Sequence, residues 1–178
     1  MRNRQLTLFA GSLPRERRCL AHGGNVRKRK RKIARPWNSA LPVHMVLRSS
    51  RARGQWSLLE NEVFGRVAQL ARVLAARFGV VLYRYANSGN HIHILARAPS
   101  RPSLQSFLRV FAGQTAQLVT HAAKGRPIGK FWDRIAYSRI VSWGREFRCV
   151  GAYVKMNEHE ALGLRPPRGR KPGSPGER

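Results

Sequence analysis

The stretch from residue 80 to residue 97 constrains the fold more than any other part of this sequence. Residues 80–85 and 91–97 are rich in aliphatic side chains, and residues 87–90 between them read Asn-Ser-Gly-Asn, a composition typical of a tight turn. Two such runs joined by a short turn predict a β-hairpin. The rest of the fold has to be built around this hairpin.

The second strand of the predicted hairpin carries two histidines that are two residues apart. Because side chains alternate along a strand, His91 and His93 project from the same face, about 7 Å apart at the backbone. Ile92 and Ile94 then project from the other face, into a core. Two imidazoles at this spacing can converge on one divalent ion or on one phosphate.

Helix-like and strand-like patterns alternate on either side of the hairpin. We expect strands over 42–48 and 135–141, and helices from a Ser57-x-x-Glu60 capping box to Gly79, from Pro102 to Gly125, and over 143–157. The order is therefore β-α-β-β-α-β-α. It predicts an α+β fold of the ferredoxin-like sandwich class, in which an antiparallel sheet has helices packed on it.

The charge of the chain points to a polyanionic partner. The sequence has 35 Lys and Arg residues against 8 Asp and Glu, a formal net charge of +27. Residues 1–36 hold 12 of the basic residues and residues 165–178 hold 5, so the remaining body still carries about +12. A body this basic predicts binding to nucleic acid. Ribosomal and membrane-surface proteins are also basic, so charge alone does not choose a function.

The pattern divides the chain into three parts. Residues 1–38 are expected to be a basic, disordered extension, in which the run of like charge at 27–32 repels itself unless a polyanion is present. Residues 39–163 form the folded domain, and residues 164–178 are a tail rich in Pro, Gly and Arg that is expected to be unstructured. No apolar run is close to the roughly 20 residues that a membrane span requires.

The last expected helix carries a tyrosine and an asparagine four residues apart. Tyr153 and Asn157 therefore lie on one face of the helix, one turn apart. The amide oxygen of Asn157 can complete a metal site begun by His91 and His93, and this places Tyr153 within reach of the metal. A phenol with a pKa of about 10 is a weak nucleophile at neutral pH unless a metal polarises the phosphate that it attacks.

These residues resemble the HUH endonucleases. The His-Ile-His at 91–93 is similar to their His-hydrophobic-His motif, and the Tyr-Val-Lys-Met-Asn at 153–157 is similar to the Tyr-x-x-x-Asn/Gln of their single-tyrosine transposase branch. Residues 42–48 and 131–134 resemble other stretches of the REP-associated tyrosine transposases in that branch. After Asn157 the chain reads Glu-His-Glu, where that family often has proline, and this departure concerns the end of the helix.

The resemblance covers about residues 40–163. It implies a transposase-like endonuclease that cleaves and rejoins single-stranded, hairpin-bearing DNA through a 5′-phosphotyrosine on Tyr153. It also implies Mg²⁺ or Mn²⁺ as the metal, with His91, His93 and Asn157 as its protein ligands. A monomer and a homodimer are both compatible with it. We expect a cytoplasmic protein associated with the bacterial nucleoid and not with a membrane.

Several residues have competing interpretations. Tyr83, Tyr85 and Tyr137 are rival nucleophiles, although each falls in an expected strand without an Asn or Gln one helical turn away. The candidates for DNA contact are His44, Arg48, Trp132, Arg134 and Lys155. His44 is equally compatible with a structural role, and Trp132 with a place in the core.

The alternative function is a non-catalytic, basic nucleic-acid-binding module of the same fold, such as an inactive or domesticated relative. Composition argues against nucleases that gather several carboxylates around two metals, because Asp133 is the only aspartate, and Glu60 and Glu62 lie at the start of a helix. Cys19 and Cys149 do not make a disulfide framework, which favours a reducing compartment.

Overall fold

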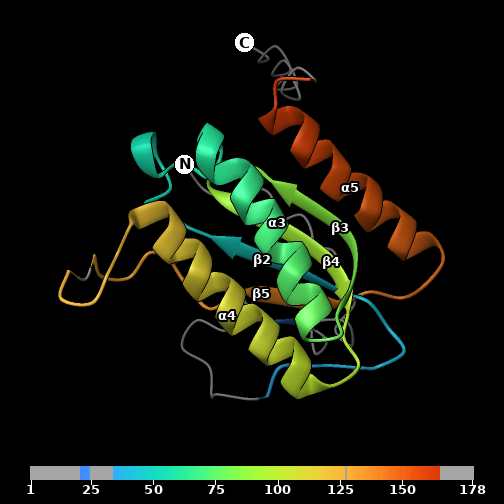
Figure 1. Cartoon of the computed structure of the whole chain (residues 1–178). Helices are drawn as coiled ribbons and strands as arrows, with labels where there is room; N and C mark the ends of the chain where they lie inside the picture. The colour runs from blue at the N-terminus through green and yellow to red at the C-terminus, as the bar shows by residue number, and fades with distance from the viewer. Residues whose placement is uncertain (1–20, 25–33, 127, 165–178) are drawn as a thin grey trace, which may run out of the picture.

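The computed structural model of the protein describes residues 21–24, 34–126 and 128–164 (Figure 1). Over these residues the chain forms, in order, β1 (Ala21–His22), β2 (Val43–Arg48), the 3-10 helix η1 (Gly54–Trp56), α3 (Asn61–Arg77), β3 (Val81–Asn87), β4 (His91–Arg97), α4 (Arg101–Thr120), β5 (Tyr137–Ile140) and α5 (Arg145–Ala161). From β2 to α5 this is the β-α-β-β-α-β-α order that the sequence predicts.

The strands of the described residues form one antiparallel sheet with the order β1-β5-β2-β4-β3. Without the short strand β1, this order and its helical crossovers are those of a ferredoxin-like sandwich, so the predicted fold class is confirmed. The pairing of β2 with β4 sets Val46 opposite His93 and Arg48 opposite His91. The register therefore brings β2 beside the histidine strand β4.

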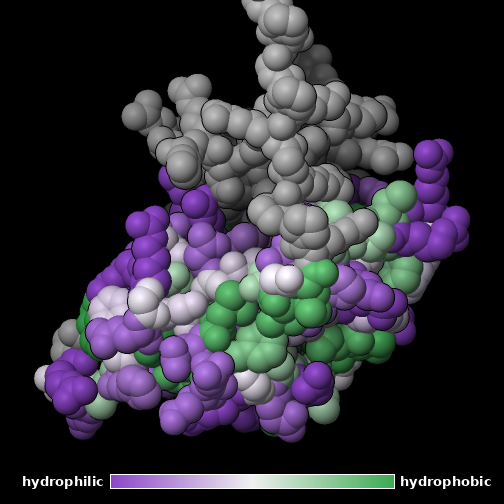
Figure 2. Space-filling model, turned by 90° about the horizontal axis from the view of Figure 1, so that it is seen from above, coloured by the Kyte–Doolittle hydropathy of each residue, from purple (hydrophilic) through white to green (hydrophobic). Residues whose placement is uncertain are grey.

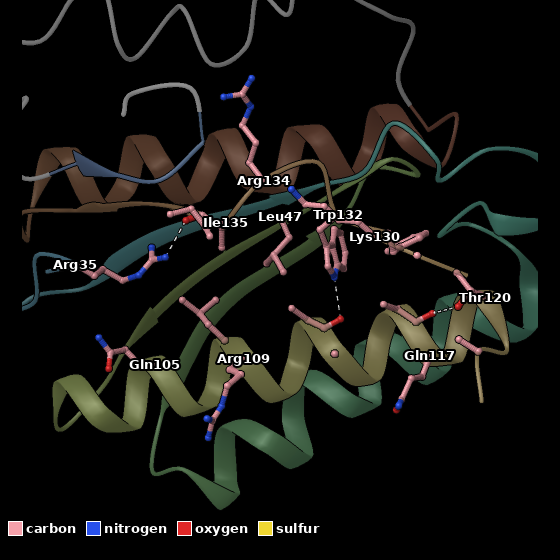
Figure 3. A pocket seen from close by; sticks show the side chains of 18 of the residues that line it. Arg35, Leu47, Gln105, Arg109, Gln117, Thr120, Lys130, Trp132, Arg134 and Ile135 are labelled. Atoms are coloured by element: carbon pink, nitrogen blue, oxygen red, sulfur yellow. Dashed lines mark hydrogen bonds between the residues drawn. The ribbon is translucent and has the colours of Figure 1, made fainter. Parts of the chain in front are cut away.

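The sheet separates two layers of helices. On one face, Ile92 and Ile94 of β4 pack in a core with Phe107 of α4 and with residues of α3. On the other face, Leu95 of β4 packs against Val154 of α5. Figure 3 shows the strands between α5 on one side and α3 and α4 on the other. Because side chains alternate along β4, one strand supplies the core and also the face beneath α5.

The start of α3 differs from the prediction. The helix begins at Asn61, and its N-cap residue Glu60 makes no side-chain capping hydrogen bond. The predicted capping box is therefore wrong. Ser57 follows the 3-10 helix η1, and its hydroxyl accepts a hydrogen bond from the backbone N–H of Leu59 at 3.2 Å, which occupies it in a local turn.

The ends of the other helices also shift. α4 ends at Thr120 instead of at Gly125, because His121 adopts a left-handed conformation with φ of 52° and stops the helix. α5 continues past Asn157 to Ala161, so the Glu-His-Glu sequence that replaces the family's proline is helical.

The short strand β1 lies within residues 1–38, where the sequence predicts a disordered extension, so that prediction does not hold for these two residues. Ala21 and His22 pair with Arg139 and Ser138 of β5 at the edge of the sheet. The charged run 27–32, Cys19 and the tail from residue 165 lie outside the described residues. On the face that Figure 2 shows, hydrophilic side chains of the described residues surround patches of hydrophobic ones. In the described part of the chain, each helix is too short or too polar to cross a bilayer.

An ion pair fixes the start of α5 to the sheet. Arg139 of β5 is buried, and its guanidinium pairs with the carboxylate of Glu146 in the first turn of α5. Burial raises the pKa of Glu146, but the hydrogen bond that it accepts from the Ser142 backbone N–H at 2.8 Å and the charge of Arg139 outweigh this and lower it. The pair therefore stays ionised at neutral pH and sets the orientation of the helix.

Candidate active site

Three histidines from two adjacent strands lie together under α5. His91 and His93 come from β4, and His44 comes from β2. The ring centroids of His91 and His93 are 4.8 Å apart. Those of His44 and His93 are 5.5 Å apart, with the rings nearly parallel. The structure thus brings the two predicted histidines together and adds a third imidazole to them.

Hydrogen bonds orient the two rings of the His-x-His pair. The Nδ1 atom of His91 lies 2.5 Å from Oδ1 of Asn90, and because an amide oxygen can only accept, Nδ1 carries the proton. The Nδ1 atom of His93 lies 3.3 Å from Nε2 of His44. The Nε2 atoms of both His91 and His93 are buried without a hydrogen-bond partner among the described residues. An unpartnered buried polar atom costs about 1–3 kcal/mol, so two of them side by side fit a site that a metal ion fills.

Burial keeps the three rings neutral. Desolvation lowers the pKa of His91 to about 4, and the nearby charge of Arg48 adds to the effect. Desolvation and the charge of Arg139 lower the pKa of His44 to about 3. The pKa of His93 falls well below its ordinary value, mainly through burial and also through the two neighbouring histidines. Neutral imidazole is the form that offers a lone pair to a metal.

Tyr153 of α5 turns its ring toward this cluster. Its ring centroid is 5.6 Å from that of His93 and 6.3 Å from that of His44, and it stands nearly perpendicular to both. Tyr153 is partly exposed, whereas His93 is only 2% exposed. The tyrosine therefore lies between the buried histidines and solvent, where a phosphate group has access to it.

Asn157 lies one turn further along α5, with its side chain buried to 4% exposure. Its Nδ2 donates a hydrogen bond to the Tyr153 carbonyl at 2.7 Å, which orients the amide. Its backbone carbonyl lies 3.5 Å from the hydroxyl of Ser88, in the turn that leads into His91. This places Asn157 at the histidine end of the hairpin. Its part as a third metal ligand stays a prediction.

The rival tyrosines pack in other surroundings. Tyr85 lies on the α3 side of the sheet, where burial raises the pKa of its hydroxyl. Tyr137 is buried beside β1, and burial raises its pKa as well. Tyr83 packs edge-on against Phe147, outside the histidine cluster. Of the four tyrosines, Tyr153 alone has a ring contact with the described histidines of the cluster, and this favours Tyr153 as the nucleophile.

Arg48 stands directly opposite His91 in the sheet, with its side chain partly exposed. Its Nε lies 3.9 Å from Oδ2 of Asp133, and Oδ1 of Asp133 accepts hydrogen bonds from the N–H and the hydroxyl of Ser50 at 2.7 and 2.8 Å. Asp133 thus holds its own segment against the end of β2. No three His, Cys, Asp or Glu side chains of the described residues are arranged to bind a metal ion. A metal at His91 and His93 therefore needs another kind of ligand, such as an amide.

Trp132 and Arg134 line a cavity of about 780 Å³ between α4 and residues 129–136 (Figure 3). The Trp132 indole points toward α4, donates its N–H to the Ala112 carbonyl at 2.8 Å and packs against the main core. This supports the structural reading of Trp132. Arg134 is exposed and points away from α4, and Lys155 is exposed on α5.

The burial of His44, whose side chain is only 3% exposed, favours its structural role over a DNA contact. His44 instead faces His93, 49 residues away in sequence, through the register of β2 against β4. For His93 to offer Nε2 to a metal, its Nδ1 must carry the proton and donate it to His44. The sequence held no signal for this pairing, because strand register is not visible in a single motif.

We expect His44→Leu to weaken divalent metal binding by about 10- to 100-fold, the range typical of partners that orient a metal ligand. His44→Gln keeps a carbonyl that accepts from His93 and should restore much of the affinity. Titration of Mn²⁺ followed by electron paramagnetic resonance measures both. Thermal unfolding of the same samples separates a loss of metal from a loss of fold. Wild-type Mn²⁺ affinity in His44→Leu would show that His44 does not orient His93.

Both the sequence and the fold can be compared with those of known proteins. Residues 38–157 match the family model of the IS200-like transposases. Among solved structures, a protein assigned as a transposase from Deinococcus radiodurans R1 aligns with a TM-score of 0.42 and 16% identity, over 72% of this chain and 98% of that one. A comparison with curated proteins found no match. The region that matches the family model, residues 38–157, includes the histidine pair and the helical turn from Tyr153 to Asn157.

Proposed function

The chain belongs to the family of IS200-like transposases, and we propose that it cuts and rejoins single-stranded DNA with Tyr153 as the nucleophile. In this proposal a divalent metal, Mg²⁺ or Mn²⁺, is held by His91, His93 and Asn157. The DNA carries a hairpin near the cleaved bond. The proposal assigns the chemistry to one chain, because the Tyr153 ring lies 5.6 Å from the His93 ring of the same chain.

One observation carries the proposal. The ring of Tyr153 stands 5.6 Å from the ring of a buried histidine, His93, whose Nε2 has no partner among the described residues. A nucleophile next to a site that can stabilise phosphate charge is the minimum that phosphoryl transfer requires. A protein that only binds DNA gains nothing from buried, unpartnered imidazole nitrogens, because each of them lowers stability.

The donor set fits a divalent cation. Imidazole nitrogens suit transition metals and an amide oxygen suits Mn²⁺ and Mg²⁺, so two imidazoles with one amide favour Mn²⁺ over Mg²⁺. Such an ion, when bound, would polarise the scissile phosphate and offset the charge that develops on its oxygens. The chain itself supplies the neutral rings, their orientation by Asn90 and His44, and the burial that shields His93 from solvent.

In the proposed step the Tyr153 Oη attacks the scissile phosphorus in line, and the bond from phosphorus to the 3′ oxygen breaks. The phenol loses its proton and the leaving 3′ oxygen gains one, which leaves a 3′-hydroxyl and a 5′-phosphotyrosine. One phosphodiester replaces another, so a 3′-hydroxyl can reverse the step and join strands without ATP. In this proposal Arg48, which is partly exposed opposite His91, pairs with phosphate oxygens.

Covalent capture tests the proposal. The full-length protein is incubated with Mn²⁺ and a hairpin-bearing single strand labelled on its 3′ side, and the products are separated under denaturing conditions. We expect the label to migrate with the protein, together with an unlabelled fragment that ends in a 3′-hydroxyl. Cleavage that leaves no label on the protein would overturn the nucleophile mechanism. A sufficiently varied set of hairpin strands that yields neither cleavage nor an adduct would favour the alternative below.

The alternative is a non-catalytic DNA-binding module. The basic charge of the chain favours it, because that charge requires a polyanion and not a reaction. This reading predicts salt-dependent binding to single strands and no covalent product with Mn²⁺ or Mg²⁺. The adduct assay therefore separates the two functions directly.

We expect the folded body to bind DNA without the basic run and the tail. Replacing residues 27–32 with glutamine and deleting 165–178 removes 6 and 5 basic residues while leaving β1 in place. Affinity for a single strand should fall, and the slope of log affinity against log salt should flatten by about 0.7 for each lost phosphate contact. Specific cleavage should stay detectable. A variant without salt-dependent binding would show that the body's charge is not a DNA footprint.

A further inference from the structure

A groove lies between strand β3 and the outer flank of α5. It encloses about 420 Å³. Two aromatic side chains, Tyr83 and Phe147, and three cations, Arg84, Arg148 and Lys155, line it. Among the described residues no acidic side chain does so. Aromatic rings between exposed cations are the composition of surfaces that bind single-stranded nucleic acid.

The aromatic wall of the groove is larger than the two lining rings. Tyr83 and Phe147 meet at right angles with centroids 5.3 Å apart. Trp143 extends the wall, 4.9 Å from Phe147 and 5.6 Å from Tyr83, and it remains 46% exposed. A cluster of three aromatic residues left partly in water marks a surface that a ligand can cover.

The cations of the groove are available to a ligand. Arg84, Arg148 and Lys155 are all exposed, and in the described part of the chain none of them forms an ion pair. Arg84 is oriented by a hydrogen bond from its Nη1 to the Tyr83 carbonyl at 2.9 Å. The charges therefore stand beside the aromatic wall without acidic partners that would compete with phosphate.

Gly151 keeps the groove open in the middle of α5. A Cβ placed on Gly151 would have no atom within 4 Å, so the space above it belongs to the groove. Glycine inside a helix lowers stability by about 1 kcal/mol relative to alanine, and packing does not require it at this position. Its absence of a side chain lets a ligand approach the helix backbone between Phe147 and Lys155.

The groove is distinct from the histidine site. Successive residues of a helix are rotated by about 100°, so Gly151 and Tyr153 point to nearly opposite flanks. Tyr153 faces His93, whereas Gly151 faces strand β3 at the edge of the sheet. A strand bound in the groove cannot be at the cleaved bond, and only the width of α5 separates the two.

We propose that this groove binds a segment of single-stranded DNA that flanks the cleaved site, with bases stacked on the aromatic wall and phosphates on the three cations. The inference rests on the proposed function, which supplies single-stranded DNA as the ligand. The size of the groove supports a single strand, since it falls in the range of about 300–1,000 Å³ that encloses small molecules and not a duplex.

The test fills the groove with the larger side chain of Gly151→Leu and measures the binding of DNA strands of two lengths. Fluorescence anisotropy compares the full-length protein on a hairpin with a minimal flank and on the same hairpin with a longer unpaired flank on either side. For the wild type, we expect the longer flank to raise affinity by roughly 5- to 150-fold per stacked base. Gly151→Leu should abolish this increment and leave the affinity and cleavage of the minimal substrate unchanged.

Two controls keep the result specific. Gly65→Leu makes the same change in α3, where an added Cβ also has no atom within 4 Å, and it should keep the full increment. Arg148→Gln with Lys155→Gln should flatten the salt slope on the long strand by about 1.4. Arg66→Gln with Arg72→Gln, two exposed arginines of α3, should not. An increment that survives Gly151→Leu, or a wild type that shows none, would overturn the groove proposal. Cleavage of the minimal substrate would still uphold the proposed function.

Discussion

Tyr153→Phe is expected to leave the protein folded, metal-binding and DNA-binding, and to abolish both cleavage and the covalent adduct. The change removes one oxygen from a partly exposed ring and keeps the edge-on contact with His93. Without the phenol there is no atom to accept the phosphate, so we expect the rate to fall by at least about 1,000-fold, which corresponds to about 4 kcal/mol of activation free energy. Single-turnover cleavage of a labelled hairpin strand measures it.

The matched controls are the other tyrosines. Tyr83→Phe and Tyr137→Phe make the same chemical change outside the histidine cluster, and both should cut DNA at nearly the wild-type rate. Peptide mapping of the wild-type adduct should place the DNA on the peptide that contains Tyr153. Normal cleavage by Tyr153→Phe, or an adduct mapped to Tyr83, Tyr85 or Tyr137, would show that the nucleophile has been misassigned.

The second large effect concerns the metal. His91→Ala together with His93→Ala should weaken Mn²⁺ binding by well over the roughly 100-fold that the loss of an orienting partner costs, because two direct ligands disappear. Cleavage should become undetectable while salt-dependent DNA binding remains. The loss of two unpartnered buried nitrogens removes a desolvation cost, so the unfolding temperature measured without metal should not fall steeply.

Metal depletion gives an independent reading of the same site. Treatment of the wild type with a chelator should stop cleavage, and Mn²⁺ should restore it at a lower concentration than Mg²⁺, as the imidazole-rich donor set implies. Asn157→Asp replaces an amide by a carboxylate and should strengthen binding of either ion. Full activity of the double histidine variant, or of the chelated protein, would rule out a metal held by these residues.

The fold was predictable because its signals are local and repeated. Alternation along β4 placed Ile92 and Ile94 in the core and His91 and His93 on the other face, as the structure has them. The order of the elements was sufficient to predict the sheet. The capping box at Ser57 failed because a preceding 3-10 helix uses that serine in its own turn. The strand β1 was missed because two residues are too few to show a pattern.

The candidate site was predictable only in part. The spacing of Tyr153 and Asn157 on one helix, and of the histidines on one strand, is visible in the sequence. The contact of His44 with His93 depends on how β2 registers against β4, and the groove depends on Tyr83 meeting Phe147 across two elements. Such pairings are properties of the assembled sheet, so they cannot be predicted from a motif within one element.

The alternation along β4 also determines how a protein of this kind can lose its activity. Odd positions of the strand carry the imidazoles and even positions carry the core, so a point substitution at His91 or His93 spares the packing of Ile92 and Ile94. An inserted residue would exchange the two faces and destroy both. Decay by substitution therefore yields a stable, basic, inert descendant in a single step, which natural selection can recruit as a DNA-binding protein before the fold degrades.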